Sequence, residues 1–168
     1  VFRKAGVELT LTFTTTLLMD DLYILSRPCS YLKVSARSTD GKNHNIKLKF
    51  DVSDELCINK KGELETEFSL VDIRDDIKAA RVGSVDQPML TRSGDDLRIE
   101  WGYFYLATNA PGAKVYGSKI DSSSYLFAEI DVNTSDNSDA LLVLAYDDIY
   151  SIVYFGEKLK AYWKNNGD

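Results

Sequence analysis

Residues 32–52 read LKVSARSTDGKNHNIKLKFDV, and this stretch decides the fold. Apolar side chains recur at every second position in residues 32–36 and again in residues 46–52. A period of two is the signature of a half-buried β-strand. The turn dipeptide Asp40-Gly41 between the two runs predicts a β-hairpin. Both apolar sets are even-numbered, so the hairpin requires a loop with an odd number of residues, or a bulge.

The same alternation continues outside this stretch. Further strands are expected at residues 7–14, 64–70, 97–105, 125–132 and 140–146. Gly102, inside one of these runs, marks a bulge or a close approach of two backbones. Residues 140–146 read ALLVLAY, which is apolar on both faces and typical of a central strand covered on two sides. Helical signals are limited to residues 75–80 and 155–163.

Many short strands separated by turns predict an all-β fold. We expect a β-sandwich of mostly antiparallel strands with one or two short helices, in a single domain over residues 1–168. A length of 168 residues fits one domain, and 44% apolar with 27% charged residues is ordinary for a globular protein. The chain begins at Val1 without an initiator Met, so we expect a segment of a longer protein.

Composition also excludes two classes of partner. No apolar run approaches the roughly 20 residues that a transmembrane helix needs, so no membrane span is expected. The net charge of −6 and the isoelectric point near 4.9 give a surface that repels phosphate groups. No nucleic-acid partner is therefore expected.

The sequence offers little for catalysis. His44 is the only histidine, and the polar segment around it favours a solvated loop residue over a catalytic base. Neighbouring residues on a strand point to opposite faces, so an acidic doublet is not by itself the carboxylate pair of a glycosidase. Turn chemistry explains the four doublets, Asp20-Asp21, Asp75-Asp76, Asp95-Asp96 and Asp147-Asp148. We assign no catalytic residue.

Cofactor and metal sites are not expected either. The chain has no phosphate-binding glycine motif and no dinucleotide fingerprint. Cys29 and Cys57 are its only cysteines, and they lack the spacing of a metal site. A disulfide between them is one reading, because both flank the predicted hairpin on the same face. Two separate thiols are the expected state.

Aromatic residues are the most informative class, with ten Tyr, seven Phe and two Trp. They are too dense along two stretches to be packed wholly inside, and they favour a sheet core with an interface to another domain. The predicted interface residues are Trp101, Tyr103, Tyr105, Tyr146, Tyr150, Tyr154, Phe155, Tyr162 and Trp163. Residues 144–168 are expected to dock on a neighbouring domain. The alternative is a carbohydrate-binding module, in which an exposed row of rings stacks on sugars.

Several long motifs resemble one known family. They read LSRP (residues 25–28), RSTDGK (37–42), DQP (86–88), SGDDLRIEWGY (93–103) and LAYDDIYSIVYFG (144–156). These stretches are similar to the N-terminal β domain of the glutaminase A family, and the resemblance runs over about residues 7–163. In that family the β domain precedes a large helical domain of the α/α-toroid kind.

The resemblance implies a parent enzyme that hydrolyses L-glutamine to L-glutamate and ammonia and is periplasmic or extracellular. No catalytic residue of the β domain is carried over. The chain is then expected to be a non-catalytic accessory β-sandwich domain that packs against the helical domain of the same parent chain. The alternative is an ancillary module of a glycoside-hydrolase-like enzyme, because such enzymes share the same plan.

Overall fold

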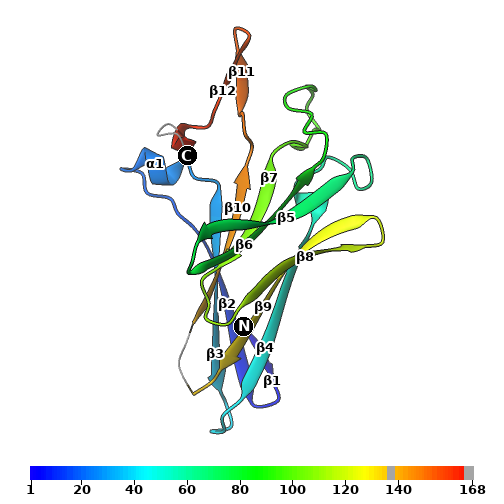
Figure 1. The fold of residues 1–168 in the computed structure, drawn as a ribbon. Coiled ribbons are helices and arrows are strands. Elements are labelled where there is room, and N and C mark those ends of the chain that lie inside the picture. The colour runs from blue at the N-terminus through cyan, green and yellow to red at the C-terminus, as the bar shows by residue number, and fades with distance from the viewer. Residues whose placement is uncertain (136–138, 165–168) are drawn as a thin grey trace.

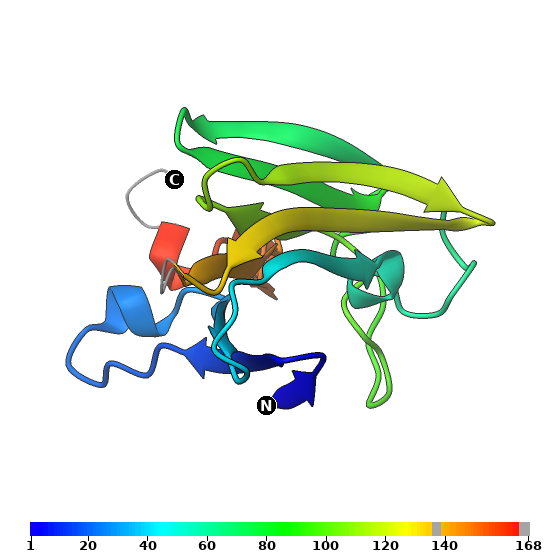
Figure 2. The ribbon, with the colours of Figure 1, turned by 90° about the horizontal axis from the view of Figure 1, so that it is seen from below.

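The structure, a computed structural model, describes residues 1–135 and 139–164, which form two packed antiparallel sheets (Figure 1, Figure 2). Among these residues the larger sheet has seven strands, in the spatial order β1 (Phe2–Lys4), β2 (Val7–Thr15), β3 (Cys29–Ser38), β10 (Ala140–Asp147), β7 (Tyr103–Thr108), β6 (Ile77–Ser84) and β5 (Thr66–Arg74). The smaller sheet has three described strands, in the order β4 (Asn45–Ser53), β9 (Ser123–Asn133) and β8 (Lys114–Ile120).

Smaller elements gather at one end of the sandwich. A hairpin of β11 (Ile152–Tyr154) and β12 (Glu157–Leu159) follows β10 and reaches beyond the other strands in Figure 1. The short helix α1 (Leu22–Leu25) contacts the 3-10 turn η2 (Tyr162–Lys164), which follows this hairpin. Another 3-10 turn, η1 (Asp54–Leu56), follows β4. Within the described part of the chain, every helix is too short or too polar to cross a membrane.

The core lies between the two sheets and is built mainly from even-numbered positions. Leu32, Leu106 and Leu142 of the larger sheet have no exposed surface, and Leu126 and Ile130 of the smaller sheet belong to the same buried cluster. Even-numbered residues stand opposite one another in the β3–β10 and β10–β7 pairs, so they form one continuous apolar face. The predicted fold class, an all-β sandwich of mostly antiparallel strands, is confirmed.

Both strands predicted in residues 32–52 form, but the predicted hairpin is wrong. β3 pairs with β2 and β10 in the larger sheet, whereas β4 pairs with β9 in the smaller one. The connection at residues 39–44 therefore crosses between the sheets. Alternation identifies the buried face of a strand and not its neighbour, and two even-numbered sets can face one core from opposite sides.

The strand predicted over residues 97–105 begins only at Tyr103. Gly102 has a φ of +87°, and a side chain there would overlap the backbone of Asp147. Glycine thus lets β7 approach the end of β10, which confirms the close approach expected at this position. Trp101 and the residues before it form a loop instead of a strand.

Neither of the two predicted helices forms. Residues 75–80 contain a two-residue turn and the start of β6, and residues 155–163 contain the tip of the hairpin, β12 and part of η2. Such short apolar runs cannot separate helix from strand by periodicity. The helix that does form is α1, where the Asp21 carboxylate caps the first turn by accepting the Ile24 N–H at 3.0 Å.

β10 occupies the centre of the larger sheet, as predicted, but the described residues bury one of its faces more completely than the other. Leu142 is fully buried in the core, whereas Leu141 is 37% exposed on the opposite side. We call that side, which points away from the smaller sheet, the outer face. One apolar row crosses it from strand to strand, consisting of Tyr31, Val143, Ala107, Ala79 and Val71.

Candidate functional site

The candidate site is the end of the molecule from which the hairpin projects. Residues 144–168, the docking segment of the sequence analysis, supply most of it, although residues 165–168 lie outside the described residues. We call residues 148–160, which comprise β11, β12 and their connections, the finger. The finger continues from the central strand β10, which carries it away from the body of the sandwich (Figure 1).

Hydrogen bonds hold the root of the finger against the sandwich. Trp101, from the loop before β7, donates its Nε1–H to the Tyr150 carbonyl at 3.1 Å. The Asp147 carboxylate accepts the Ile149 N–H at 2.8 Å and forms an ion pair with Lys164 of η2. These bonds join three separate segments of the chain, so the fold sets the direction in which the finger points.

The finger and its surroundings expose many apolar side chains. Phe155 at the tip is 91% exposed, and its ring meets that of Tyr154 edge to face, with the centroids 4.6 Å apart. Other exposed apolar residues at this end are Ile152, Val153, Leu159 and Tyr162 near the finger, and Leu17, Leu18, Met19 and Leu22 beside α1. The group beside α1 was not found in the sequence, because residues 17–22 follow no period. Exposed apolar groups of this extent mark interaction sites.

A cleft of about 360 Å³ opens on the outer face between α1 and η2. Its floor contains Cys29, Ala145 and Tyr105, which lie opposite one another on β3, β10 and β7. Tyr23 of α1 and Trp163 of η2 form walls, and the remaining lining residues are Arg27, Pro28, Tyr146 and Asp147. Trp163 is therefore half-buried here, in contrast to Tyr154 of the finger.

The cleft contains a cation but no activated nucleophile among its lining residues. The guanidinium of Arg27 lies 4.3 Å from the ring centroid of Tyr23, and its hydrogen bond to Tyr23 raises the pKa of Arg27. Burial raises the pKa of the Cys29 thiol and of the Tyr146 hydroxyl, so both stay protonated at neutral pH. Both cysteines are free thiols, and burial also raises the pKa of Cys57 to about 12.

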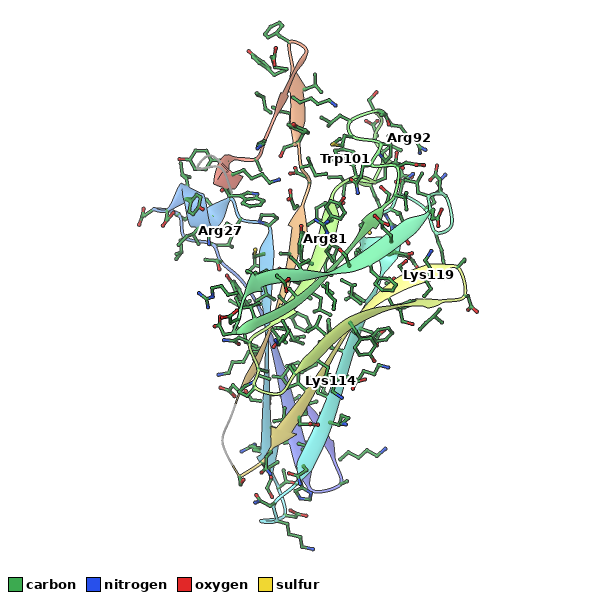
Figure 3. All side chains as sticks on the ribbon, viewed as in Figure 1. Arg27, Arg81, Arg92, Trp101, Lys114 and Lys119 are labelled. Atoms are coloured by element: carbon green, nitrogen blue, oxygen red, sulfur yellow. The ribbon has the colours of Figure 1, made fainter. Side chains whose placement is uncertain are left out.

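Trp101, Tyr103 and Tyr105 do not form one row of exposed rings. Trp101 lies in the loop before β7, and the other two project from the outer face of that strand. The guanidinium of Arg81 lies 4.1 Å from the ring centroid of Tyr103 and covers one face of that ring. Figure 3 shows Arg81 in the middle of the sheet and Trp101 nearer its upper end. Sugar stacking on Tyr103 would have to displace Arg81 or use the other face of the ring.

His44 belongs to the connection that crosses between the sheets. Its Nε2 lies 2.8 Å from Oδ1 of Asp40, and the same oxygen accepts hydrogen bonds from the Ser38 hydroxyl and the Lys42 N–H, both at 3.0 Å. The bond to His44 is the main reason that the pKa of Asp40 falls to about 2. Ser38 bonds to the carboxylate and not to the imidazole, so the three do not form a nucleophile, base and acid relay.

Three of the four acidic doublets stabilise local structure. Asp21 caps α1, Asp76 pairs with Arg74 at 2.8 Å in the turn after β5, and Asp147 holds the root of the finger. Among residues 1–135 and 139–164, the side chains of His, Cys, Asp and Glu form no group of three that could hold a metal ion.

Comparison with known proteins places the chain in a family without defining its function. No curated protein matches the sequence. The sequence profile described as "Domain of unknown function (DUF5127)" matches residues 1–129. This range ends within β9, so β10, the finger and η2 lie beyond it. Because the match covers well over half of the 168 residues, the chain belongs to the DUF5127 family of domains of unknown function.

Proposed function

We propose that this chain is a non-catalytic accessory module that docks, through its finger end, on a helical domain of the same multidomain protein. The observation that carries the proposal is the 91% exposure of Phe155 at the tip of the finger, together with the exposure of the apolar side chains of its two strands, Ile152, Val153, Tyr154 and Leu159. A two-stranded hairpin of this size is marginally stable in water. Apolar surface that the chain itself leaves uncovered is suited to a protein interface.

The finer identity of the partner rests on the resemblance of the sequence motifs to the glutaminase A family. The proposed parent is a glutaminase-like hydrolase, periplasmic or extracellular, whose chemistry resides in the helical domain. The protonated Cys29 and the loop position of His44 support a role without catalysis for this chain. Pure chain incubated with L-glutamine should release no ammonia. Release at the rate of an enzyme would contradict the proposal.

The direct test is association with the separately produced helical domain, measured by titration calorimetry. Replacing Tyr154 with Ala should weaken binding by about 1–3 kcal/mol, as truncation of an aromatic anchor commonly does. The side chain is 60% exposed, so circular dichroism of the isolated variant should be unchanged. Full binding by this variant would remove Tyr154 from the interface. Failure of the unsubstituted chain to bind would reject the docking role.

A carbohydrate-binding role is the competing proposal, carried over from the aromatic content of the sequence. It predicts that a sugar changes the fluorescence of Trp101 or Trp163, the two tryptophans of the chain. A glycan array followed by a fluorescence titration would decide it. If neither measurement detects sugar binding, the carbohydrate-binding role is rejected and only the docking role remains.

A further inference from the structure

The tip of the finger is conformationally strained. Tyr154 pairs with Glu157, which leaves Phe155 and Gly156 as a two-residue turn with φ values of +46° and +88°. A turn with both φ values positive is of type I′ and favours Asn-Gly or Asp-Gly. A bulky residue at positive φ is an outlier, so Phe155 destabilises the turn that it occupies.

Packing within the chain does not compensate for this strain. Phe155 is 91% exposed, and the ring that it meets, that of Tyr154, is itself 60% exposed. The side chain therefore weakens the turn and adds nothing to the core. Strained backbone conformations cluster at functional sites such as ligand clamps, so the strain at Phe155 points to a role in function.

The root of the finger is strained as well and is firmly held. Ile149 has a φ of +60°, which is rare for a β-branched residue. Its N–H donates to Asp147, and the next carbonyl, that of Tyr150, accepts from Trp101. A finger anchored in this way pays less conformational entropy when a partner binds it.

The two faces of the finger differ in chemistry. Ile152 stands opposite Leu159 and Tyr154 stands opposite Glu157, all on one face. The three apolar side chains of this face, Ile152, Leu159 and Tyr154, are 53%, 41% and 60% exposed, and Glu157, nearest the tip, is exposed as well. The other face carries Val153 opposite Lys158. Among the described residues no carboxylate lies within ion-pair distance of Lys158, whose nitrogen is 5.8 Å from the ring centroid of Tyr150.

From this arrangement we propose that the finger is an insertion element. Phe155 enters a closed apolar pocket of the partner domain. The side chains of Ile152, Tyr154 and Leu159 lie in an apolar groove that leaves Glu157, on the same face, in contact with water. Carboxylates on the rim of that groove meet Lys158. The identity of the partner rests on the proposed function. The inference adds which residues insert and what the partner must present to them.

The first experiment uses Phe155→Asn, which places the preferred residue in the type I′ turn and removes the ring. In the isolated chain, hydrogen exchange of the β11 and β12 amides should become slower, because the turn is relieved of strain. Binding to the helical domain in calorimetry should become about 10- to 100-fold weaker. Leu70→Asn on β5, where the side chain is 68% exposed, is the matched control and should leave both measurements unchanged.

The second variant tests the charge on the other face. Lys158→Glu should weaken binding at low salt, and the difference from the unsubstituted chain should shrink as the salt concentration rises, because salt screens the interaction with carboxylates. A merely structural role of Lys158 would not depend on salt in this way. An unchanged affinity at low salt would exclude an acidic rim.

The outcomes separate the inference from the proposed function. Weaker binding by Phe155→Asn, together with slower exchange in the isolated chain, supports insertion. Unchanged binding by Phe155→Asn while the unsubstituted chain binds overturns the insertion and leaves docking in place. If Leu70→Asn weakens binding and Phe155→Asn does not, the interface lies at β5, and the insertion of the finger is also overturned. No binding by the unsubstituted chain rejects the docking function, and the insertion with it.

Discussion

At the scale of single residues, Glu8 holds the N-terminal edge of the larger sheet together. It lies on β2, is 6% exposed, and accepts hydrogen bonds from Arg37 of β3 and from Arg3 of β1, the latter at 2.5 Å. These bonds, with that from Arg37 the larger cause, lower the pKa of Glu8 from 4.5 to about 2. One carboxylate thus joins three neighbouring strands.

This lowered pKa predicts how stability depends on pH. A carboxylate whose folded pKa lies below its unfolded pKa stabilises the fold fully above the unfolded value. The contribution of Glu8 should therefore be complete above about pH 4.5 and fade toward pH 2. Urea titrations should find Glu8→Gln less stable than the unsubstituted chain at pH 7, with the gap closing at low pH.

The exposed Glu157 of the finger, which has no ion-pair partner among the described residues, provides the control. Glu157→Gln should not alter stability at pH 7. A gap between Glu8→Gln and the unsubstituted chain that stays constant from pH 7 to pH 2 would mean that the charge of Glu8 has no part in the effect.

Some single residues could be anticipated from the sequence and others could not. Gly102 was expected to allow a close approach, because a glycine among bulky strand residues has few other reasons to be there. The aromatic residues of the finger were expected to be accessible because they are too dense in the sequence to be packed wholly inside. The contact between Arg27 and Tyr23 was not anticipated, since it depends on a helix of only four residues.

At the scale of elements, the alternation of apolar residues predicted strands well and their partners poorly. β2, β9 and β10 form close to the expected ranges, and β3 and β4 form but do not pair. Alternation reports burial of one face, which a strand obtains equally in either sheet of a sandwich. A helix was predicted over residues 155–163, where β12 forms, because these nine residues contain too little periodic signal to separate helix from strand.

The contact between η2 and α1 gives a prediction at this scale. Trp163 forms a wall of the outer-face cleft and is half-buried, so Trp163→Ala should lower the free energy of unfolding by about 1–2 kcal/mol. Tyr154→Ala removes an exposed ring and should change it by less than about 0.5 kcal/mol. Urea unfolding followed by circular dichroism measures both. Equal stability of the two variants would mean that Trp163 contributes no packing.

At the scale of the whole molecule, the family match and the structural unit have different extents. The profile ends at residue 129, within β9, whereas β10 lies between β3 and β7 in the larger sheet. Without β10 the sheet is divided into β1–β3 on one side and β5–β7 on the other. Residues beyond the match are therefore part of the fold.

A fragment of residues 1–129 should accordingly fail to fold, because Leu32 and Leu106 lose their neighbour Leu142 and the core opens. A fragment of residues 1–147, which keeps β10 and lacks the finger, should unfold cooperatively in urea. Circular dichroism and the dispersion of amide proton signals distinguish the two. Cooperative unfolding of the shorter fragment would show that β10 is an addition to an already complete sandwich.

The central place of β10 also bears on how the protein is made. Ribosomes synthesise a chain from its N-terminus at about 5–20 residues per second. β10 is therefore the last strand of the sandwich to emerge. Until then β3 and β7 are open edges, and the core residues Leu32 and Leu106 lack their neighbour Leu142. Closure joins strands that are distant in sequence, which makes it slow. The interval before β10 emerges is therefore when this protein most needs a chaperone.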